Sequence, residues 1–256
     1  MVNIKTKEEI LTIRRAGKIL HGAMELVKRE LRPGIKTEEL DAMVEEFIIS
    51  EGGTPAFKGF QGFPKSICSS IDSQVVHGIP DDRELKEGEI VSIDIGVNVD
   101  GYNTDSANTF AIGEVSDRIN ELIDVTEKAL HLGIEQATIG NTIGDISKAI
   151  QEYAESNGFS VVRQLVGHGI GKSLHEEPKV PNFVDGTPGE TLEEGMVLAI
   201  EPMFTMDSPD VTTDSDGWTI LAKDGKPAAH FEHTIAITNS GPKILTNGKP
   251  LELELN

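Results

Sequence analysis

The sequence contains only one cysteine, Cys68, among 256 residues. One thiol cannot form an intrachain disulfide, so a reducing compartment is expected. The N-terminal residues lack an apolar signal core, and no apolar run approaches the length of a membrane span. A cytoplasmic protein that is soluble and has no membrane partner is therefore expected.

Positive charge is also scarce, because 23 Lys and Arg residues stand against 43 Asp and Glu residues, for a net charge of −20. Nonspecific binding to nucleic acids or anionic membranes needs clusters of Lys and Arg, so this balance disfavours both. A solvated acidic surface accounts for most of the excess. A few of the acids could instead lie in a metal cluster, and charge alone does not separate the two interpretations.

Apolar periodicity predicts four amphipathic helices. The first opens with a capping box at Thr6-Lys-Glu-Glu9 and stops at Pro33-Gly34. The others are expected from Thr37 to Gly52, over residues 119–130, and over residues 146–154 with a stop at Gly158.

The second and fourth of these helices align without gaps at a spacing of 106 residues. Gly34 then falls on Gly140, and Val44 on Ile150. Two amphipathic helices can coincide in this way by chance. The alternative is a duplicated helix-helix-strand unit, which would place two related halves around one shared site. Without linkers or low-complexity tracts, the simplest interpretation is a single α+β domain over 1–256, with halves of roughly 1–113 and 114–256.

Two β-like runs, 89–99 and 102–110, flank Asp100-Gly101, a dipeptide typical of a two-residue hairpin turn. In that register Asp94 faces Ala107 and Asp105 faces Gly96. The two aspartates then share one face as diagonal neighbours, about 7–8 Å apart at Cα. Further strands are expected at 196–204, 219–222 and 228–238.

Asp94 and Asp105 lie among apolar residues of the predicted hairpin. Aspartate is depleted in strands, and an unpaired charge in an apolar environment is costly. The two side chains could simply face solvent on a half-exposed sheet. They could instead hold one or two cations between them.

Three more residues favour the second interpretation. Glu201 and Glu232 each lie inside an apolar β-like run, and His168 is flanked by glycines in Gly167-His168-Gly-Ile-Gly171. If these residues converge with the aspartates, about four like charges would be buried together, and two divalent ions would remove that repulsion. One imidazole with four carboxylates suits Mn²⁺, Fe²⁺, Co²⁺ or catalytic Zn²⁺, and such two-metal sites hydrolyse amides and phosphate esters. Spacing alone does not show that the five residues converge.

The sequence resembles the type I, bacterial-type methionine aminopeptidases over nearly its whole length. Five motifs carry the resemblance: Val75-Val-His77-Gly-Ile-Pro80, Ile93-Asp94 through Asp105, Gly167-His-Gly-Ile-Gly171 through Pro178, Ile200-Glu-Pro-Met203, and Glu232-His-Thr234. The resemblance implies the pita-bread fold, with two pseudo-symmetric halves and a curved antiparallel sheet covered by helices. It implies a metallo-exopeptidase that removes the initiator methionine, preferentially before a small second residue, by attack of a metal-bridging water or hydroxide.

The same resemblance implies roles for individual residues. Two divalent metal ions would be held by Asp94, Asp105, His168, Glu201 and Glu232, with Asp105 and Glu232 bridging. His175 would bind the scissile carbonyl oxygen, His77 would contact the leaving amide nitrogen, and Glu201 would act as general base. The remaining histidines, His21, His131, His230 and His233, are interpreted as structural.

The matching positions of the methionine pocket are Phe57, Phe60, Phe63, Cys68, Leu174 and Trp218. An apolar, partly aromatic slot suits a flexible thioether. The sequence departs from the family pattern at four of these positions. Phe60 and Phe63 replace tyrosines, Phe57 a smaller residue and Leu174 an aromatic one, so the strictness of methionine selection stays open.

Two alternatives remain. A proline-directed aminopeptidase or dipeptidase would share the fold and ligands, but such enzymes usually carry an extra N-terminal domain, for which 256 residues leave no room. A non-catalytic pita-bread binding protein would typically lose ligands or catalytic histidines, and all seven positions are intact. The expected partners are the N-terminal methionine of nascent polypeptides and, transiently, the ribosome, with no direct nucleic-acid specificity and a monomeric state.

Overall fold

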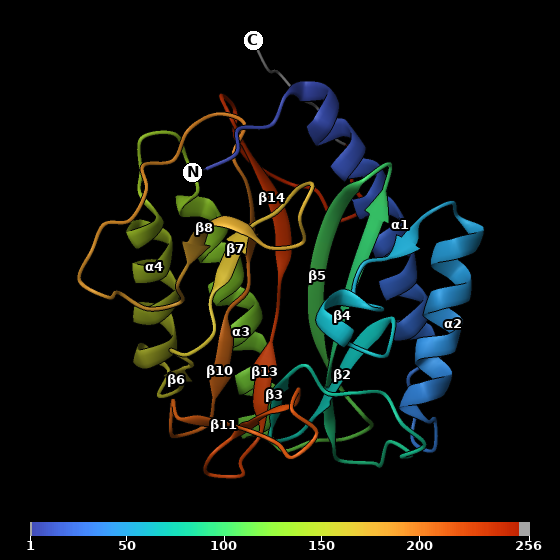
Figure 1. Cartoon of the computed structure of the whole chain (residues 1–256). Helices are drawn as coiled ribbons and strands as arrows, with labels where there is room; N and C mark the ends of the chain where they lie inside the picture. The colour runs from blue at the N-terminus through green and yellow to red at the C-terminus, as the bar shows by residue number, and fades with distance from the viewer. Residues whose placement is uncertain (1, 251–256) are drawn as a thin grey trace.

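The structure is a computed structural model that describes residues 2–250. Strands occupy the middle of the molecule, and two pairs of helices lie on its outer sides (Figure 1). The helices are α1 Lys7–Glu30, α2 Thr37–Ser50, α3 Asp117–Gln136 and α4 Ile143–Ser156. A short 3₁₀ helix, η1, covers Phe60–Gly62.

Helix α1 begins as the sequence predicts. Thr6 Oγ1 accepts a hydrogen bond from the Glu9 amide at 3.3 Å, and the Glu9 carboxylate accepts one from the Thr6 amide at 2.8 Å. These reciprocal bonds satisfy two amides that the first helical turn leaves without partners. The apolar face, with Ile13, Leu20 and Val27, is buried.

Helices α2 and α4 both contain 14 residues and begin at the predicted spacing of 106. The turn before each helix is built in the same way. The Gly34 amide donates to the Leu85 carbonyl at 2.8 Å, and the Gly140 amide donates to the Leu192 carbonyl at 3.0 Å. Both glycines have a positive φ, which other residues rarely adopt. The glycine turn and the helix that recur in the sequence therefore also recur in the structure.

Strands β4 Ile90–Val99 and β5 Tyr102–Ala111 form the predicted hairpin. Asp94 pairs with Ala107 and Gly96 with Asp105, so the predicted register is confirmed. Asp100 and Gly101 have φ values of 51° and 83°. Two consecutive positive φ values are what a type I′ hairpin turn requires.

Two other strand predictions were wrong in one respect, because each predicted strand is broken. Residues 196–204 form β9 Val197–Ile200 and β10 Met203–Thr205, and residues 228–238 form β13 Ala228–His230 and β14 His233–Thr238. Pro202 has no N–H to donate to a ladder. The Glu232 amide turns away from its own sheet and donates to the Ala107 carbonyl of β5 at 2.9 Å. The breaks fall at Glu201 and Glu232.

The strand pairs among the described residues are all antiparallel. Strands β4 and β5 share a sheet with β1 Thr54–Pro55 and β2 Ile67–Ile71. The larger sheet of the other half has the order β15-β14-β9-β7-β8, with β7 Gly167–Gly169, β8 Glu176–Val180 and β15 Gly241–Ile244. Two small sheets, β13-β10-β6 and β11-β12-β3, add β3 Gln74–Val76, β6 Ser160–Val161, β11 Val211–Thr213 and β12 Ile220–Ala222.

Each pair of helices buries its apolar face against one half of the strands. Leu20 of α1 and Val44 of α2 share a core with Ile93 of β4, and Leu130 of α3 and Ile150 of α4 share one with Ile235 of β14. Full burial of a side chain of this size contributes about 1.5–3 kcal/mol. These two cores hold the strands that meet in the middle of the molecule.

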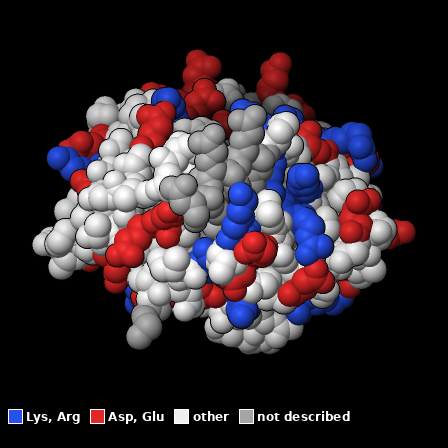
Figure 2. Space-filling view, turned by 90° about the horizontal axis from the view of Figure 1, so that it is seen from above, with Lys and Arg blue, Asp and Glu red and all other residues white. Residues whose placement is uncertain are grey.

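Within residues 2–250, no helix combines the length and the apolar character needed to cross a membrane. On the face shown in Figure 2, Lys and Arg side chains gather toward the middle and right, with Asp and Glu side chains around them. Basic side chains are therefore present in a group on this face, although the net charge of the chain is negative.

Candidate metal centre

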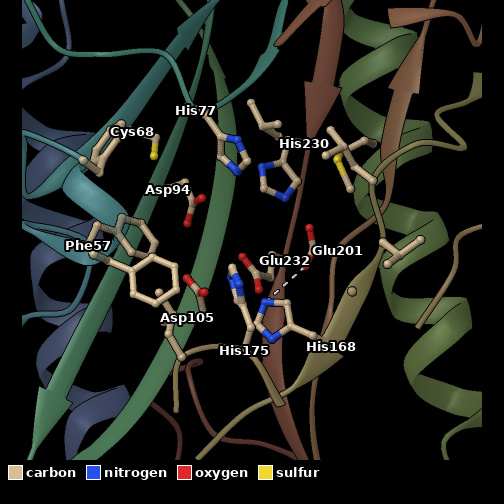
Figure 3. Close-up of a pocket in the computed structure, with 18 of the residues that line it drawn as sticks. Phe57, Cys68, His77, Asp94, Asp105, His168, His175, Glu201, His230 and Glu232 are labelled. Carbon is tan, nitrogen blue, oxygen red and sulfur yellow. Dashed lines mark ion pairs between the residues drawn. The ribbon is translucent and has the colours of Figure 1, made fainter. Parts of the chain in front are cut away.

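The five predicted ligands converge on one cavity of about 520 Å³ between the two halves (Figure 3). Each comes from a different strand or strand end. They are Asp94 in β4, Asp105 in β5, His168 in β7, Glu201 directly after β9, and Glu232 directly before β14. The structure thus brings together residues that lie far apart in the sequence.

Ligand atoms within this group lie close enough to share a cation. One ligand atom each from Asp105, His168 and Glu232 all lie within 4.8 Å of one another. His168 Nε2 lies 3.5 Å from Glu201 Oε1. A nitrogen and several carboxylate oxygens at such distances make a ligand set suited to a divalent transition metal.

Burial makes the ionised form of this cluster costly. It raises the pKa of Asp94 to about 7. Burial, and then repulsion from the neighbouring carboxylates, raises the pKa of Asp105, Glu201 and Glu232 well above the ordinary range. Asp94 Oδ1, Asp105 Oδ1 and Glu232 Oε1 are buried without a hydrogen-bond partner. Cations would supply both the missing partners and the missing positive charge, so the residues present fit a divalent-metal site.

His168 is oriented for ligation. Its Nδ1 lies 2.9 Å from the Gly169 carbonyl oxygen. A carbonyl can only accept, so Nδ1 carries the proton and Nε2 presents its lone pair to the carboxylates. Burial, together with the nearby His175, lowers the pKa of His168 to about 4, so the imidazole is neutral, which is the form that binds metals.

Hydroxyl groups join the two halves behind the ligands. Thr234 Oγ1 donates to the Asp105 carbonyl at 2.8 Å and accepts from the Asp105 amide at 2.9 Å. Ser106 Oγ donates to the Glu232 carbonyl at 2.6 Å. These bonds attach β5 to the start of β14, so the backbones that carry Asp105 and Glu232 are held together.

His77 and His175 also line the cavity. His77 follows β3 and has a φ of 61°, a strained value for a residue with a side chain. The His175 ring lies 4.3 Å from the His168 ring and 5.2 Å, edge to face, from Phe60. Burial, and then the charge of His175, lowers the pKa of His77 to about 4, and burial lowers the pKa of His175. Both imidazoles are therefore neutral hydrogen-bonding groups near pH 7.

The six predicted pocket residues form one apolar part of the same cavity. They are Phe57, Phe60, Phe63, Cys68, Leu174 and Trp218. Phe63 and Trp218 meet edge to face with ring centroids 5.2 Å apart. Cys68 pairs with Asp94 across β2 and β4, so this apolar slot begins directly beside the carboxylates.

One histidine that lines the cavity was not predicted from the sequence to do so. His230 was interpreted as structural, but it lines the cavity, is 2% exposed and has an Nε2 without a partner. The strand break between His230 and His233 interrupts the alternation that would otherwise have linked His230 to Glu232. Val76, Leu165 and Met203 also line the cavity, whereas His21, His131 and His233 do not.

Comparisons with known proteins agree with this geometry. Residues 12–239 match metallopeptidase family M24. The methionine aminopeptidase of Clostridium perfringens is 52% identical over 96% of this chain and 99% of its own length. The crystal structure of methionine aminopeptidase from Rickettsia prowazekii superposes with a TM-score of 0.94 at 40% identity, covering 96% of this chain and 100% of that one. Prolidase from Pyrococcus furiosus gives a TM-score of 0.76 at 27% identity, and the match covers 96% of this chain but 66% of that one.

The fold and the buried carboxylate-histidine cluster define a metallopeptidase with the pita-bread fold. The chain belongs to metallopeptidase family M24, in the group of bacterial-type methionine aminopeptidases.

Proposed function

We propose that this chain is a metal-dependent aminopeptidase that removes the N-terminal methionine from peptides and nascent proteins, preferentially when the second residue is small. One observation carries the proposal: the five-residue ligand cluster and the apolar slot share one cavity, with Cys68 of the slot paired to Asp94 of the cluster. A side chain held in the slot would therefore place its own amine and carbonyl at the carboxylates. The methionine aminopeptidases to which the chain is similar support methionine as that side chain.

Asp94, Asp105, His168, Glu201 and Glu232 would hold two divalent ions. Manganese, iron, cobalt and zinc all suit one imidazole with four carboxylates. When bound, such a pair supplies a Lewis acid and lowers the pKa of water enough to give a nucleophile at neutral pH.

The chain's own groups would perform the proton transfers. Glu201 would accept a proton from the attacking water while the water oxygen bonds to the scissile carbonyl carbon. His175 would donate a hydrogen bond to the carbonyl oxygen as negative charge develops there. His77 would contact the amide nitrogen. That nitrogen takes up the proton that Glu201 accepted from water as the C–N bond breaks. As neutral imidazoles, His77 and His175 each carry one N–H group that can donate a hydrogen bond.

The apolar slot would select the first side chain. A thioether is flexible and polarisable, and it makes favourable contacts with aromatic rings such as those of Phe57, Phe63 and Trp218. His175 and Phe60 stand edge to face where the slot meets the ligand cluster, so the donor to the carbonyl is also part of the slot. Binding of the side chain and placement of the carbonyl would thus be coupled.

We further propose that the enzyme acts as a monomer in the cytoplasm and contacts the ribosome transiently, without sequence-specific binding of nucleic acid. The net charge of −20 opposes lasting contact with an anionic particle. The basic side chains that gather on the face in Figure 2 would supply local positive charge for a brief contact.

A peptide panel distinguishes this function from its rivals. The protein, freed of metal by chelation and then supplied with Mn²⁺ or Co²⁺, should release the first residue of Met-Ala-Ser and leave Ala-Pro-Ala intact. Cleavage of Ala-Pro-Ala alone would assign the chain to the proline-directed enzymes of the same fold. Binding of both peptides without cleavage, at any metal concentration, would indicate a non-catalytic binding protein.

A further inference from the structure

The segment before α1 carries a buried cation that faces the loop of His175. Lys5 Nζ lies 2.7 Å from Glu176 Oε2, and the two side chains are 5% and 6% exposed. Glu176 follows His175 directly in the sequence and lines the cavity, whereas Lys5 does not. Buried charges are retained only where they are paired and hydrogen-bonded, so this ion pair is a specific contact rather than a surface coincidence.

The Glu176 carboxylate is held at both oxygens. Oε2 accepts hydrogen bonds from Lys5 Nζ and from Asn3 Nδ2, the latter at 3.0 Å, and Oε1 accepts one from the Ser173 amide at 3.1 Å. Burial alone raises the pKa of Glu176, but these hydrogen bonds outweigh it and leave the pKa below its usual value. The carboxylate is therefore ionised near neutral pH and anchored to the N-terminal segment and to its own loop.

Two glycines allow the N-terminal segment to lie this close. A Cβ on Gly171 would be 2.7 Å from Lys5 Cε and 2.9 Å from a Glu176 oxygen. The Lys5 amide donates to the Gly195 carbonyl at 2.8 Å, and a Cβ on Gly195 would be 2.8 Å from the Lys5 carbonyl oxygen. A side chain at either glycine would therefore collide with Lys5.

Strand β5 holds the loop from another direction. Asn103 Nδ2 donates to the carbonyls of Gly171 and Lys172 at 3.0 and 3.1 Å. The Asn103 amide also donates to the Gly171 carbonyl, at 2.7 Å. Asn103 thus fixes the beginning of the loop, and Glu176 fixes its end. Glu176 also begins β8, where it pairs with Gly169 of β7, and His175 lies directly before it.

We propose that Lys5 is a positioning residue for His175: its buried ion pair with Glu176 fixes the loop 171–176, so that the imidazole stays aimed at the scissile carbonyl oxygen. This inference rests on the proposed function, because it takes His175 as the donor to that oxygen. A hydrogen bond to the carbonyl oxygen that strengthens as negative charge develops in the transition state lowers the activation barrier without tightening substrate binding. Loss of Lys5 should therefore lower kcat and leave KM nearly unchanged.

The test uses Lys5→Met in the full chain, with metal restored and Met-Ala-Ser as substrate. Methionine keeps most of the volume of the lysine stem and removes the charge. We expect kcat to fall about tenfold or more, with KM within about twofold. In the His175→Ala background the same substitution should change kcat less than about twofold, because residues that act through one another are not additive. Lys5→Arg, which retains a cation, should restore at least half of the lost activity.

Two controls separate positioning from a general loss of stability. Arg83→Met breaks the ion pair between Arg83 and Glu89, whose charged atoms lie 2.8 Å apart. Neither residue lines the cavity, so kcat should be unchanged. Amide exchange at Ser173, which donates to Glu176, should accelerate at least about tenfold in Lys5→Met. If Lys5→Met does not fold, Lys5→Gln replaces it in every comparison.

Several results would overturn the inference. One is an unchanged kcat in folded Lys5→Met, and another is an equal loss in the wild-type and His175→Ala backgrounds. Either would leave the proposed function intact. If His175→Ala itself retains the full kcat, the role of His175 in the proposed function is wrong, and the inference about Lys5 falls with it.

Discussion

His168 Nε2 lies 3.5 Å from Glu201 Oε1, although the two residues come from different strands. His168 pairs with Ala199 across β7 and β9, and Glu201 follows the last residue of β9. The break in the strand at Glu201-Pro202 places the carboxylate beside the imidazole. The Glu201 carbonyl is in turn held by Asn182 Nδ2 at 2.9 Å, so the backbone at this break is fixed.

Glu201→Gln should leave the shape of the cavity intact and remove the group that accepts a proton. General bases contribute about 10²–10⁴-fold, so kcat for Met-Ala-Ser should fall by at least about a hundredfold. Steady-state kinetics at saturating Mn²⁺ measure this, with Glu45→Gln, a substitution outside the cavity, as the control. A Glu201→Gln enzyme with near-normal kcat would remove Glu201 from the mechanism.

The metal-free protein should lose stability as pH rises from about 4 toward 7. Burial raises the folded-state pKa of Asp94 to about 7, whereas the unfolded chain releases that proton near its ordinary pKa. Between the two values the native state holds more protons than the unfolded state, so the free energy of unfolding falls as pH rises. Urea unfolding of chelated protein at several pH values measures the slope.

Repulsion within an acidic protein gives a slope of the same sign, so a matched variant is needed. Asp94→Asn removes one of the four buried carboxyls of the ligand cluster with a raised pKa and only one of the 43 acids. It should flatten the dependence between pH 5 and 7 and make the metal-free protein more stable at pH 7. An identical slope in the variant would show that Asp94 does not contribute to the effect.

Two of the five ligands could be placed side by side from the sequence because their geometry is local, whereas the full ligand set followed from the family resemblance. The register that joins Asp94 and Asp105 follows from the Asp100-Gly101 turn, and the structure confirms it. The spacing of 106 residues between α2 and α4 was also visible, because each helix carries its own apolar period and its own preceding glycine turn.

Pro202 is a local signal for the break at Glu201, but no local pattern predicts the break at Glu232. The apolar run around Glu232 favours a continuous strand, yet the Glu232 amide donates to the Ala107 carbonyl of a distant strand. That bond exists only once β5 and β14 have packed together. His230 was missed for the same reason: a histidine in an apolar run is usually structural, and only the assembled cavity shows what it faces.

Thr234→Val should destabilise the protein by about 2–3 kcal/mol. The substitution removes both bonds to Asp105 and leaves its amide and carbonyl buried without partners. Thr234→Ser keeps the hydroxyl and should cost less than about 1 kcal/mol. Urea denaturation of the metal-free proteins measures both values. Equal stabilities for the valine and serine variants would mean that these bonds contribute little to joining the two halves.

Cys68 should be unreactive in the folded protein. Burial, and then the negative charge of Asp94, raises the pKa of its thiol, and only the thiolate is a nucleophile. Iodoacetamide at pH 8 should therefore add no mass to native protein within an hour and one carbamidomethyl group in 8 M urea. Because Cys68 is the only cysteine, intact-mass measurement reads this directly. Rapid alkylation of native protein would show that the slot opens to solvent.

The most direct test of the account follows methionine release from Met-Ala-Ser by chelator-treated protein as Mn²⁺ is added, while bound Mn²⁺ is measured in parallel. The account predicts no release without metal, and release that rises with occupancy up to two ions per chain. Asp105→Asn, which removes the charge of one proposed ligand, should weaken metal binding. Full methionine release by metal-free protein, or none with the metal site filled, would contradict it.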